Sequence, residues 1–456
     1  MTLADATLDE VDQVVAQADG CFSTFRKLSG FNRAAFLLQI KKELQKDQAE
    51  IIGIAEQETA LGKKRLSMEF ERTLGAIENF SRLCTKEPWL KPKPTPKTDG
   101  TKGGIKMLPL GPVAVIGACN FPLAISVVGT DTMSALMVGC PVVVKSHPGH
   151  PQTCEKLADA VRRAIKISKM PVGCFHLFHG KRNEVTQYLV KHPLLSAIAF
   201  TGSLGGGFAL HRTNQERKNP VPFYAEMGSL NPVFALPYLI GSNSKKFAQD
   251  FVQAVNLFAG QMCTKPGALF ILKSSLTKDF SHALRTAIEK QITLPMLNSE
   301  IHANYENSCL HLEKEIQLFC SSVNQPSGNY GKVNIFTMDG SKFLGSRNLR
   351  AEAFGPSSIL VLVEDENQLL RIAESLDGSL TASLHGTEED HQLSEKILPI
   401  LESKVGRLLY NGFPPGVVPG NATHHGGPWP ATTDSRFTSI GRHGYQRFLR
   451  PLFRHS

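Results

Sequence analysis

The sequence of 456 residues contains no run of about 18 consecutive apolar residues, the length that a helix needs to cross a bilayer. We therefore expect no membrane span and no membrane partner. The first twenty residues contain acidic side chains but neither Lys nor Arg. That segment resembles neither the basic start of a secretory signal nor an Arg-rich transit peptide, so we expect a cytoplasmic protein.

The nine cysteines are an odd and dispersed set, and no two of them form a CxxC pair. This spacing predicts neither a disulfide framework nor a metal site. The formal charge is +9, but the basic residues are spread thinly and no aromatic side chains interleave with them. We expect no nucleic-acid partner, although a positive surface attracts anionic ligands.

Helix and strand patterns divide the chain into several parts. The length predicts two domains. Residues from about 8 to 83 show helical periodicity without proline, and a Pro/Lys/Gly-rich segment follows at 89–104. Short β-rich runs then alternate with helical stretches up to about 226, and again over 227–410, which predicts two α/β units with parallel strands. Residues 409–439 are crowded with Gly, Pro and Thr and are expected to form a long irregular loop.

Three side chains are candidates for catalysis. Cys263 lies in the turn-rich run FAGQMCTKPG, where a thiol can point into a cleft and act as a nucleophile, although a lone Cys is more often buried filler. Glu226 ends a β-like run and can act as a general base, or it can be an ordinary Glu at a strand end. Asn120 follows another strand, and its amide can stabilise an oxyanion, a contribution of about 3 kcal/mol when the donor is preorganised. It can equally be an ordinary Asn in a turn at a strand end.

A second set of residues is typical of a phosphate site. In AIAFTGSLGGGFAL, Gly202 and Gly207 frame Ser203 at an expected helix N-terminus, where backbone N–H groups favour a phosphate. The run does not match GxGxxG, so by itself it is weak evidence for a dinucleotide. Lys145 follows a hydrophobic strand and can reach a ribose or a phosphate, or can simply be solvated.

In this order, the segments resemble the aldehyde dehydrogenase superfamily over nearly the whole chain. The resemblance implies that Cys263 is the nucleophile of the motif GQMCT, Glu226 the general base and Asn120 the oxyanion donor of NFP. It also implies a nicotinamide dinucleotide site that includes the two residues Glu352 and Phe354 of EAFGP. The remaining cofactor residues are expected to be Lys145, Arg182, Gly202, Ser203 and Gly207.

The resemblance predicts an α/β fold of the aldehyde dehydrogenase type. Residues 1–94 and 109–226 are expected to form a Rossmann-like cofactor domain, and residues 227–430 a catalytic domain. The segments 95–108 and 431–456 are expected to bridge subunits, since they help build the oligomer in this superfamily. A homodimer is therefore predicted.

Within the superfamily, the sequence looks most like a group that contains 2,5-dioxopentanoate (α-ketoglutarate semialdehyde) dehydrogenases and an NADP-dependent fatty aldehyde dehydrogenase. The predicted substrate is accordingly 2,5-dioxopentanoate, with medium or long aliphatic aldehydes as the alternative. A catalytically idle homologue that acts as a binding protein is a third reading. Either His424 or His425 of the irregular loop can lie at the mouth of the site, where we expect His424, or a histidine here can simply stabilise the loop.

The cofactor is expected to be NADP, with NAD possible. NAD-preferring relatives often carry a Glu three residues beyond the strand-end Lys, and this sequence has Pro148 there. Losing that carboxylate removes repulsion against a 2′-phosphate, which Lys145 and Arg182 can also attract. The presence of Glu226 favours hydrolysis of a thioester on Cys263, because acylating relatives that pass it to coenzyme A generally lack this Glu.

Overall fold

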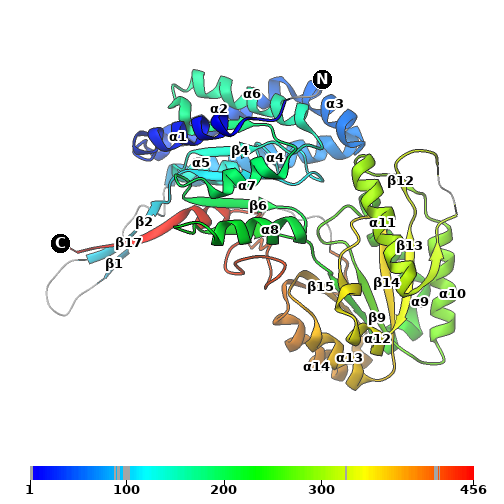
Figure 1. Cartoon of the computed structure of the whole chain (residues 1–456). Helices are drawn as coiled ribbons and strands as arrows, with labels where there is room; N and C mark the ends of the chain where they lie inside the picture. The colour runs from blue at the N-terminus through cyan, green and yellow to red at the C-terminus, as the bar shows by residue number, and fades with distance from the viewer. Residues whose placement is uncertain are drawn as a thin grey trace.

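The computed structural model describes residues 4–86, 89, 93–95, 103–323, 326–414, 420 and 422–455. Within them, the strands form sheets of five, seven, three and two strands. Figure 1 shows the five-stranded and the seven-stranded sheet as two separate bodies, each covered by helices. None of the described helices is both long enough and apolar enough to cross a membrane.

Four helices open the chain, as the proline-free periodicity predicts. They are α1 (Leu8–Phe25), α2 (Gly30–Lys46), α3 (Gln48–Thr59) and α4 (Lys63–Lys86). The side chain of Thr7 caps α1 by accepting from the N–H of Glu10, and the Glu10 carboxylate accepts from the N–H of Thr7. This reciprocal pairing satisfies two donors that a helix start otherwise leaves open.

The first large sheet is parallel throughout, as expected. Its strands are β3 (Val113–Ile116), β4 (Val142–Lys145), β5 (Phe175–Phe178), β6 (Ala197–Thr201) and β7 (Phe223–Glu226). They lie in the order β5-β4-β3-β6-β7, so strand addition reverses direction between β3 and β6. Ligands of such sheets bind outside the carboxyl ends of the strands at this reversal.

Helices cover both faces of this sheet, which explains why its strands are apolar along their whole length. Val113 and Val115 of β3 share one core with α2 and α4, whereas Ala114 and Ile116 share another with α1. The connecting helices are α5 (Thr130–Val138), α6 (Pro151–Ile167), α7 (Asn183–Lys191) and α8 (Leu204–Gln215). Of these, α5 and α6 lie on the face of α2, and α7 and α8 on the face of α1.

The second large sheet contains β8 (Pro232–Ala235), β9 (Ala268–Leu272), β11 (Gln317–Ser321), β13 (Asn334–Asp339), β14 (Ser357–Val363), β15 (Ser379–His385) and β16 (Val405–Tyr410). Its order is β11-β13-β14-β9-β8-β15-β16, and only the edge strand β11 runs antiparallel among these described strands. The helices α9 (Pro237–Asn256) and α10 (Thr277–Glu289) cover one face. The other face is covered by α11 (Ser299–Glu315), α12 (Gly340–Gly345), α13 (Glu366–Ser375) and α14 (His391–Glu402).

Short elements complete the chain. The strands β10 (Leu294–Pro295) and β12 (Tyr330–Gly331) form the two-stranded pair. Single-turn 3₁₀ helices are η1 (Val172–Cys174), η2 (Leu257–Gly260), η3 (Arg347–Arg350), η4 (Glu388–Asp390) and η5 (Gly444–Phe448).

An arm of three antiparallel strands extends from the first sheet, as Figure 1 shows. It contains β1 (Lys93–Thr95), β2 (Gly103–Pro109) and β17 (Leu449–His455). The C-terminal strand β17 pairs with β2, which directly follows most of the Pro/Lys/Gly-rich segment, from Leu449 opposite Pro109 to His455 opposite Gly103. Part of the predicted bridging segment, residues 96–102, lies outside the described residues. The role of this arm in an oligomer stays a prediction.

The sequence did not indicate three strands of the second sheet, β11, β13 and β16. The expected irregular loop from 409 in fact begins with the last two residues of β16. Downstream of β16, the described part of that loop forms no helix or strand up to residue 443, although Thr432 makes an isolated bridge to Glu226. The loop is therefore irregular but anchored.

Candidate active site

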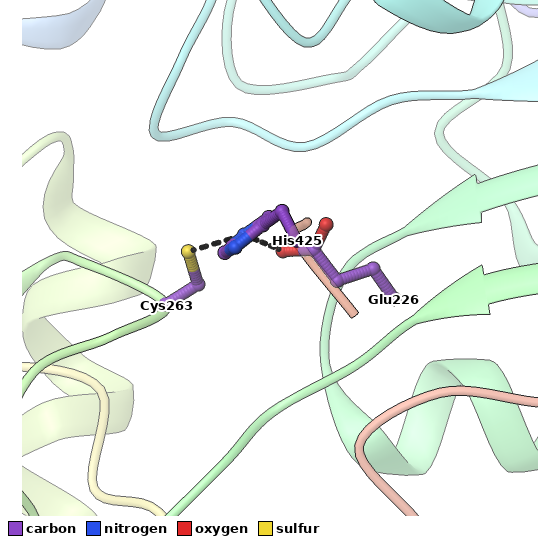
Figure 2. Close-up of side chains that lie close together, drawn as sticks. All are labelled: Glu226, Cys263 and His425. Carbon is purple, nitrogen blue, oxygen red and sulfur yellow. Dashed lines mark hydrogen bonds and ion pairs between the residues drawn. The ribbon is translucent and has the colours of Figure 1, made fainter. Parts of the chain in front are cut away.

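Three side chains from distant parts of the sequence meet in one cluster, shown in Figure 2. Nε2 of His425 lies 2.8 Å from Oε1 of Glu226 and 3.4 Å from Sγ of Cys263. Glu226 ends β7 of the first sheet, Cys263 follows η2 beside the second sheet, and His425 belongs to the C-terminal loop. Only 3% of Glu226 and 2% of His425 are exposed. The cluster is thus a buried junction of three chain segments.

The main chain of β7 holds both Glu226 and the loop that carries His425. The N–H of Met227 donates to Ala431 O at 2.8 Å, so the loop runs antiparallel beside the strand end. Farther along the loop, Ser439 donates its hydroxyl to Oε2 of Glu226 and its N–H to the carbonyl of His425. These contacts order the loop without regular secondary structure.

A strained turn positions Cys263. Phe258, Ala259 and Gly260 have consecutive positive φ angles of 54°, 55° and 66°. Non-glycine residues in this region cost about 1–3 kcal/mol each and persist only where surrounding contacts impose them. One such contact comes from Asn231, whose amide donates to the carbonyl oxygens of Cys263 at 2.8 Å and of Lys265 at 3.0 Å.

Asn120, which follows β3, lies beside the same turn. Its Nδ2 donates to Gln261 O at 3.0 Å, which leaves the second amide hydrogen available for a ligand. Arg65 of α4 donates to Asn120 O at 2.6 Å, and its guanidinium lies 4.1 Å from the ring centroid of Phe258. Arg65 therefore braces the Asn120 loop against the turn before Cys263.

Charges in the cluster favour an ionised Glu226 beside a protonated thiol. Burial by itself would raise the pKa of Glu226, but His425 and hydrogen bonds from His425, Ser439 and Cys263 outweigh it and lower that pKa. Burial and the nearby carboxylates of Glu226 and Glu352 raise the pKa of Cys263 well above its ordinary value. The thiol therefore needs a base when it reacts.

The single nitrogen Nε2 cannot serve both neighbours as an acceptor. An ionised carboxylate only accepts hydrogen bonds, so Nε2 carries its hydrogen toward Glu226. His425 is then a donor, and it can also donate to a thiolate on Cys263 once that thiolate forms. The base that the arrangement offers to the thiol is Glu226, which interacts with it directly.

The predicted phosphate-binding turn lies at the start of α8. Ser203 is the N-cap, and its Oγ accepts from the N–H of Gly206 at 3.2 Å. A Cβ at Gly202 would lie 2.6 Å from the ring of Phe200, and one at Gly207 would lie 2.3 Å from the sulfur of Met227. Glycine at both positions thus permits the strand and the helix to pack closely, with the helix N-terminus facing the ligand side of the sheet.

Lys145 is the last residue of β4, Arg182 precedes α7, and both lie near Asp5. Burial lowers the pKa of Lys145 to about 8, and the Asp5 charge acts on it in the opposite direction. Arg182 is exposed, and its Nε lies 3.3 Å from Oδ2 of Asp5. The cation predicted to attract a phosphate is therefore already paired, and a carboxylate lies beside it.

Glu352 offers an unused acceptor. Its Oε1 is buried and has no hydrogen-bond partner within the described part of the chain, while Oε2 accepts from the N–H of Ser229 at 3.3 Å. Burial raises the pKa of Glu352 to about 7, although Lys265 and the Ser229 N–H favour its ionised form. A sugar hydroxyl would satisfy this orphaned oxygen. Phe354, two residues later, is partly buried.

The structure thus brings Cys263, Glu226 and Asn120 into one region. The histidine in this region is His425, whereas the sequence predicted His424. His424 is half-buried, and its Nε2 would lie 3.0 Å from a Cβ built at Gly426, whereas its neighbour His425 contacts the thiol and the carboxylate. An irregular loop has no period that tells which of two adjacent histidines faces inward. Asn231 was also missed.

The donor atoms of Glu226, Cys263 and His425 all lie within 4.8 Å of one another, close enough to share a metal ion. The sequence predicted no metal because metal-ligand spacing is absent from it. Three possible ligands that lie far apart in the sequence produce no recognisable ligand spacing. The absence of a metal therefore stays a prediction.

A family model described as "Aldehyde dehydrogenase family" matches residues 1–427. The chain is 39% identical to the alpha-ketoglutaric semialdehyde dehydrogenase of Acinetobacter baylyi, over 98% of this chain and 87% of that protein. It is 36% identical to alpha-ketoglutaric semialdehyde dehydrogenase 2 of Azospirillum brasilense, over 97% and 86%.

Solved structures show the fold. The 1-pyrroline-5-carboxylate dehydrogenase from Thermus with bound NAD superposes with a TM-score of 0.85 at 20% identity, covering 99% of this chain and 86% of that one. A proline utilization A structure from Bradyrhizobium japonicum gives a TM-score of 0.85 at 22% identity. It covers 100% of this chain and 46% of that chain, so this chain spans about half its length.

The turn before Cys263 generates a stability prediction. A Cβ at Gly260 would lie 2.2 Å from Gly355 O in a backbone of positive φ. Gly260→Ala is expected to destabilise the fold by about 2–5 kcal/mol through strain and overpacking, seen as a fall in Tm of several degrees. The control is Gly53→Ala in α3, where nothing lies within 4 Å and the better helix former should hold or raise Tm. Equal Tm values for the two variants would contradict the account of the turn.

Proposed function

Because the chain belongs to the aldehyde dehydrogenase family, we propose that Cys263, His425 and Glu226 form its active site and that 2,5-dioxopentanoate is its substrate. The chain is an enzyme that oxidises aldehydes to carboxylic acids with a nicotinamide dinucleotide. One observation carries the assignment of the site. The partly buried thiol of Cys263 and the buried carboxylate of Glu226 share one imidazole nitrogen, at 3.4 and 2.8 Å.

The first step is attack of the Cys263 sulfur on the aldehyde carbon. The thiol proton passes to Glu226, and His425 Nε2–H, already at 3.4 Å, donates to the developing thiolate. The carbonyl oxygen becomes an oxyanion, which accepts from the free amide hydrogen of Asn120 and from the N–H of Cys263. Nicotinamide, when bound, supplies the hydride acceptor that turns this adduct into a thioester.

The second step is hydrolysis. Glu226 first releases to solvent the proton that it took from the thiol. The carboxylate then takes a proton from a water molecule, the hydroxide adds to the thioester carbon, and the C–S bond breaks. The carboxylic acid leaves and the sulfur regains a proton. Ser439 and His425 keep the Glu226 carboxylate oriented between the two steps, because each donates to one of its oxygens. Release to water, rather than transfer to coenzyme A, follows from this base.

The cofactor is proposed to lie across the carboxyl ends of β3, β4 and β6. The N-terminus of α8 at Ser203 suits the pyrophosphate, Lys145 suits the adenosine ribose, and the orphaned Oε1 of Glu352 suits the nicotinamide ribose, with Phe354 beside the ring. NADP is proposed to be accepted at least as well as NAD, since Pro148 stands where a carboxylate would repel a 2′-phosphate. The negative charge of Asp5 beside Lys145 and Arg182 disfavours a 2′-phosphate and so opposes this preference.

The substrate proposal follows the two most similar relatives described above, both named for α-ketoglutaric semialdehyde. That compound is an anion, which suits a chain of net charge +9. Aliphatic aldehydes of medium or long chain are the alternative. The homodimer and the cytoplasmic location stay predictions from the sequence.

A substrate panel tests the function. With NADP or NAD, the purified protein is expected to oxidise 2,5-dioxopentanoate with a higher kcat/KM than aliphatic aldehydes of six to fourteen carbons, measured by formation of the reduced cofactor. Cys263→Ala should lower the rate by roughly 10³-fold or more because no other group replaces the nucleophile. Cys21→Ala, on α1, is the control and should keep activity. Full activity in Cys263→Ala would overturn the assignment.

Removing the base should separate the two steps. In Glu226→Gln, thioester hydrolysis is expected to slow by roughly 10²- to 10⁴-fold. A covalent acyl-enzyme on Cys263 should then accumulate and be visible by mass spectrometry of the intact protein. Glu374→Gln, an exposed residue of α13, is the matched control. Failure to trap an acyl-enzyme, together with an unchanged rate, would show that another group activates the water.

Asp5 allows a test of cofactor choice. Asp5→Asn is expected to raise the ratio of kcat/KM for NADP over NAD by roughly threefold to tenfold, because it removes a negative charge beside Lys145 and Arg182. Steady-state rates at equal cofactor concentrations provide the measurement, with Asp9→Asn on α1 as the control. A wild-type protein that strongly prefers NAD would overturn the NADP proposal.

A further inference from the structure

Three adjoining cavities lead from the surface beside α4 to Glu226. The outer cavity has a volume of about 240 Å³, and each of the two inner ones about 10 Å³, room for roughly one water. The outer and middle cavities share Ala76 and Thr130, and the middle and inner cavities share Ala124 and Thr130. Glu226 and Ser439 line the innermost one. The three cavities therefore lie one beside another between the surface and the carboxylate of the catalytic cluster.

The outer cavity is positively charged. Arg82, Lys86 and Arg442 line it, and none of its described lining residues is acidic. The nearby carboxylate of Glu78, on the same helix, pairs with Arg82. At the inner end, Asp131 is neutralised by Arg447 at 2.5 Å. A mouth of this charge raises the local concentration of anions and leaves neutral molecules unaffected.

Arg72 of α4 stands at the middle cavity, between the mouth and the cluster. Its guanidinium lies 5.4 Å from the ring centroid of Phe121 and forms no hydrogen bond or ion pair with the described part of the chain. Glu69, three residues earlier on the same helix, uses Oε1 to accept from the N–H groups of Leu123 and Ala124, and its Oε2 has no hydrogen-bond partner among the described residues. Arg72 thus keeps all its donors for a ligand.

The electrostatic setting of Arg72 also favours an anionic ligand. Burial lowers the pKa of Arg72, so its charged form lacks the solvation it would have in water. The charges of Glu69, Cys263 and Glu226 act on it in the opposite direction, which means that Arg72 lies within electrostatic range of the nucleophile and the base. A carboxylate bound there would supply the missing compensation with two parallel hydrogen bonds.

We propose that Arg72 binds a carboxylate at the far end of the aldehyde, that this anionic substrate enters along the row of cavities by displacing their lining side chains, and that the aldehyde carbon then lies at Cys263. The inference rests on the proposed function, since it assigns substrate selection to the same catalytic thiol. The substrate class is an ω-oxo carboxylic acid, short enough for the acid and the aldehyde to span the distance from Arg72 to the cluster.

A second arginine, Arg407 of β16, also acts electrostatically on Cys263 and Glu226, and two of its nitrogens are buried without partners. It does not line any of the three cavities, whereas Arg72 does. The carboxylate is therefore assigned to Arg72. Substitution of Arg407 is expected to affect charged and neutral aldehydes alike.

The test compares two aldehydes of nearly the same shape, 5-oxopentanoate and its methyl ester, in the full-length enzyme. The wild type should prefer the acid, and rising salt should lower kcat/KM for the acid more than for the ester. In Arg72→Gln, the preference for acid over ester should fall by roughly 10- to 100-fold, mostly through KM. Arg72→Lys should keep part of that preference. Arg371→Gln, an exposed arginine on α13, is the matched control and should leave it unchanged.

Several outcomes would overturn the inference. An equal loss for acid and ester in Arg72→Gln would make Arg72 a structural residue, and a wild type that oxidises the ester as well as the acid would leave no carboxylate site to assign. A wild type that oxidises no aldehyde contradicts the proposed function instead, so the two failures are distinguishable.

A second variant tests the passage independently. Ala76 lies between the outer and middle cavities, so Ala76→Phe should narrow the route and raise KM for both aldehydes by roughly tenfold or more, with Tm confirming a folded protein. An unchanged KM for both in a folded variant would mean that the substrate reaches Cys263 by another path.

Discussion

One imidazole nitrogen joins the two halves of the structure. Nε2 of His425 contacts the carboxylate that ends β7 of the five-stranded sheet and the thiol that precedes β9 of the seven-stranded sheet. The contact exists only because the C-terminal loop lies antiparallel beside β7 and because the turn at Phe258–Gly260 turns Cys263 toward it. Both supports are energetically demanding, one being a long loop without regular structure and the other a turn of positive φ. The site is therefore held by tertiary contacts, and local propensity contributes little to it.

Sequence patterns predicted the parts of the molecule that repeat with a period. The apolar runs at β3, β4 and β6 are buried on both faces, so they stand out from the sequence and also mark where Asn120, Lys145 and Ser203 lie. The motifs around Cys263 and Glu226 predicted chemistry, and the structure places these two side chains together. The sequence did not predict strands β11 and β16, because partly exposed edge strands such as QLFCS and VGRLLY lack a continuous apolar run. The sequence did not predict the roles of His425 and Asn231, because their positions follow from contacts across more than 30 residues of sequence, which no local pattern encodes.

Charge is distributed unevenly around the cluster. The negative groups Glu226 and Glu352 raise the pKa of the Cys263 thiol and keep it protonated at rest, while the charge of Arg407 acts on that pKa in the opposite direction. Burial lowers the pKa of Arg72 and Arg407, and the charges of Cys263 and Glu226 in turn act to raise it. A thiol in this setting stays unreactive toward stray electrophiles until a ligand changes the local balance. The orphaned oxygen of Glu352 and the unpaired donors of Arg72 are the two groups that a cofactor and an anionic substrate would neutralise. Reactivity and occupancy of the site are linked through these charges.

The last stretch of chain has two tasks. Residues 422–443 carry His425 and Ser439 to Glu226, and the same stretch continues through η5 into β17, which pairs with β2 in the arm. Fraying of that final strand would loosen the only covalent tether that the described C-terminal loop has on its downstream side. The arm thus fixes the downstream end of the segment that carries His425 and Ser439, so one continuous stretch of chain contributes both to the catalytic cluster and to the arm.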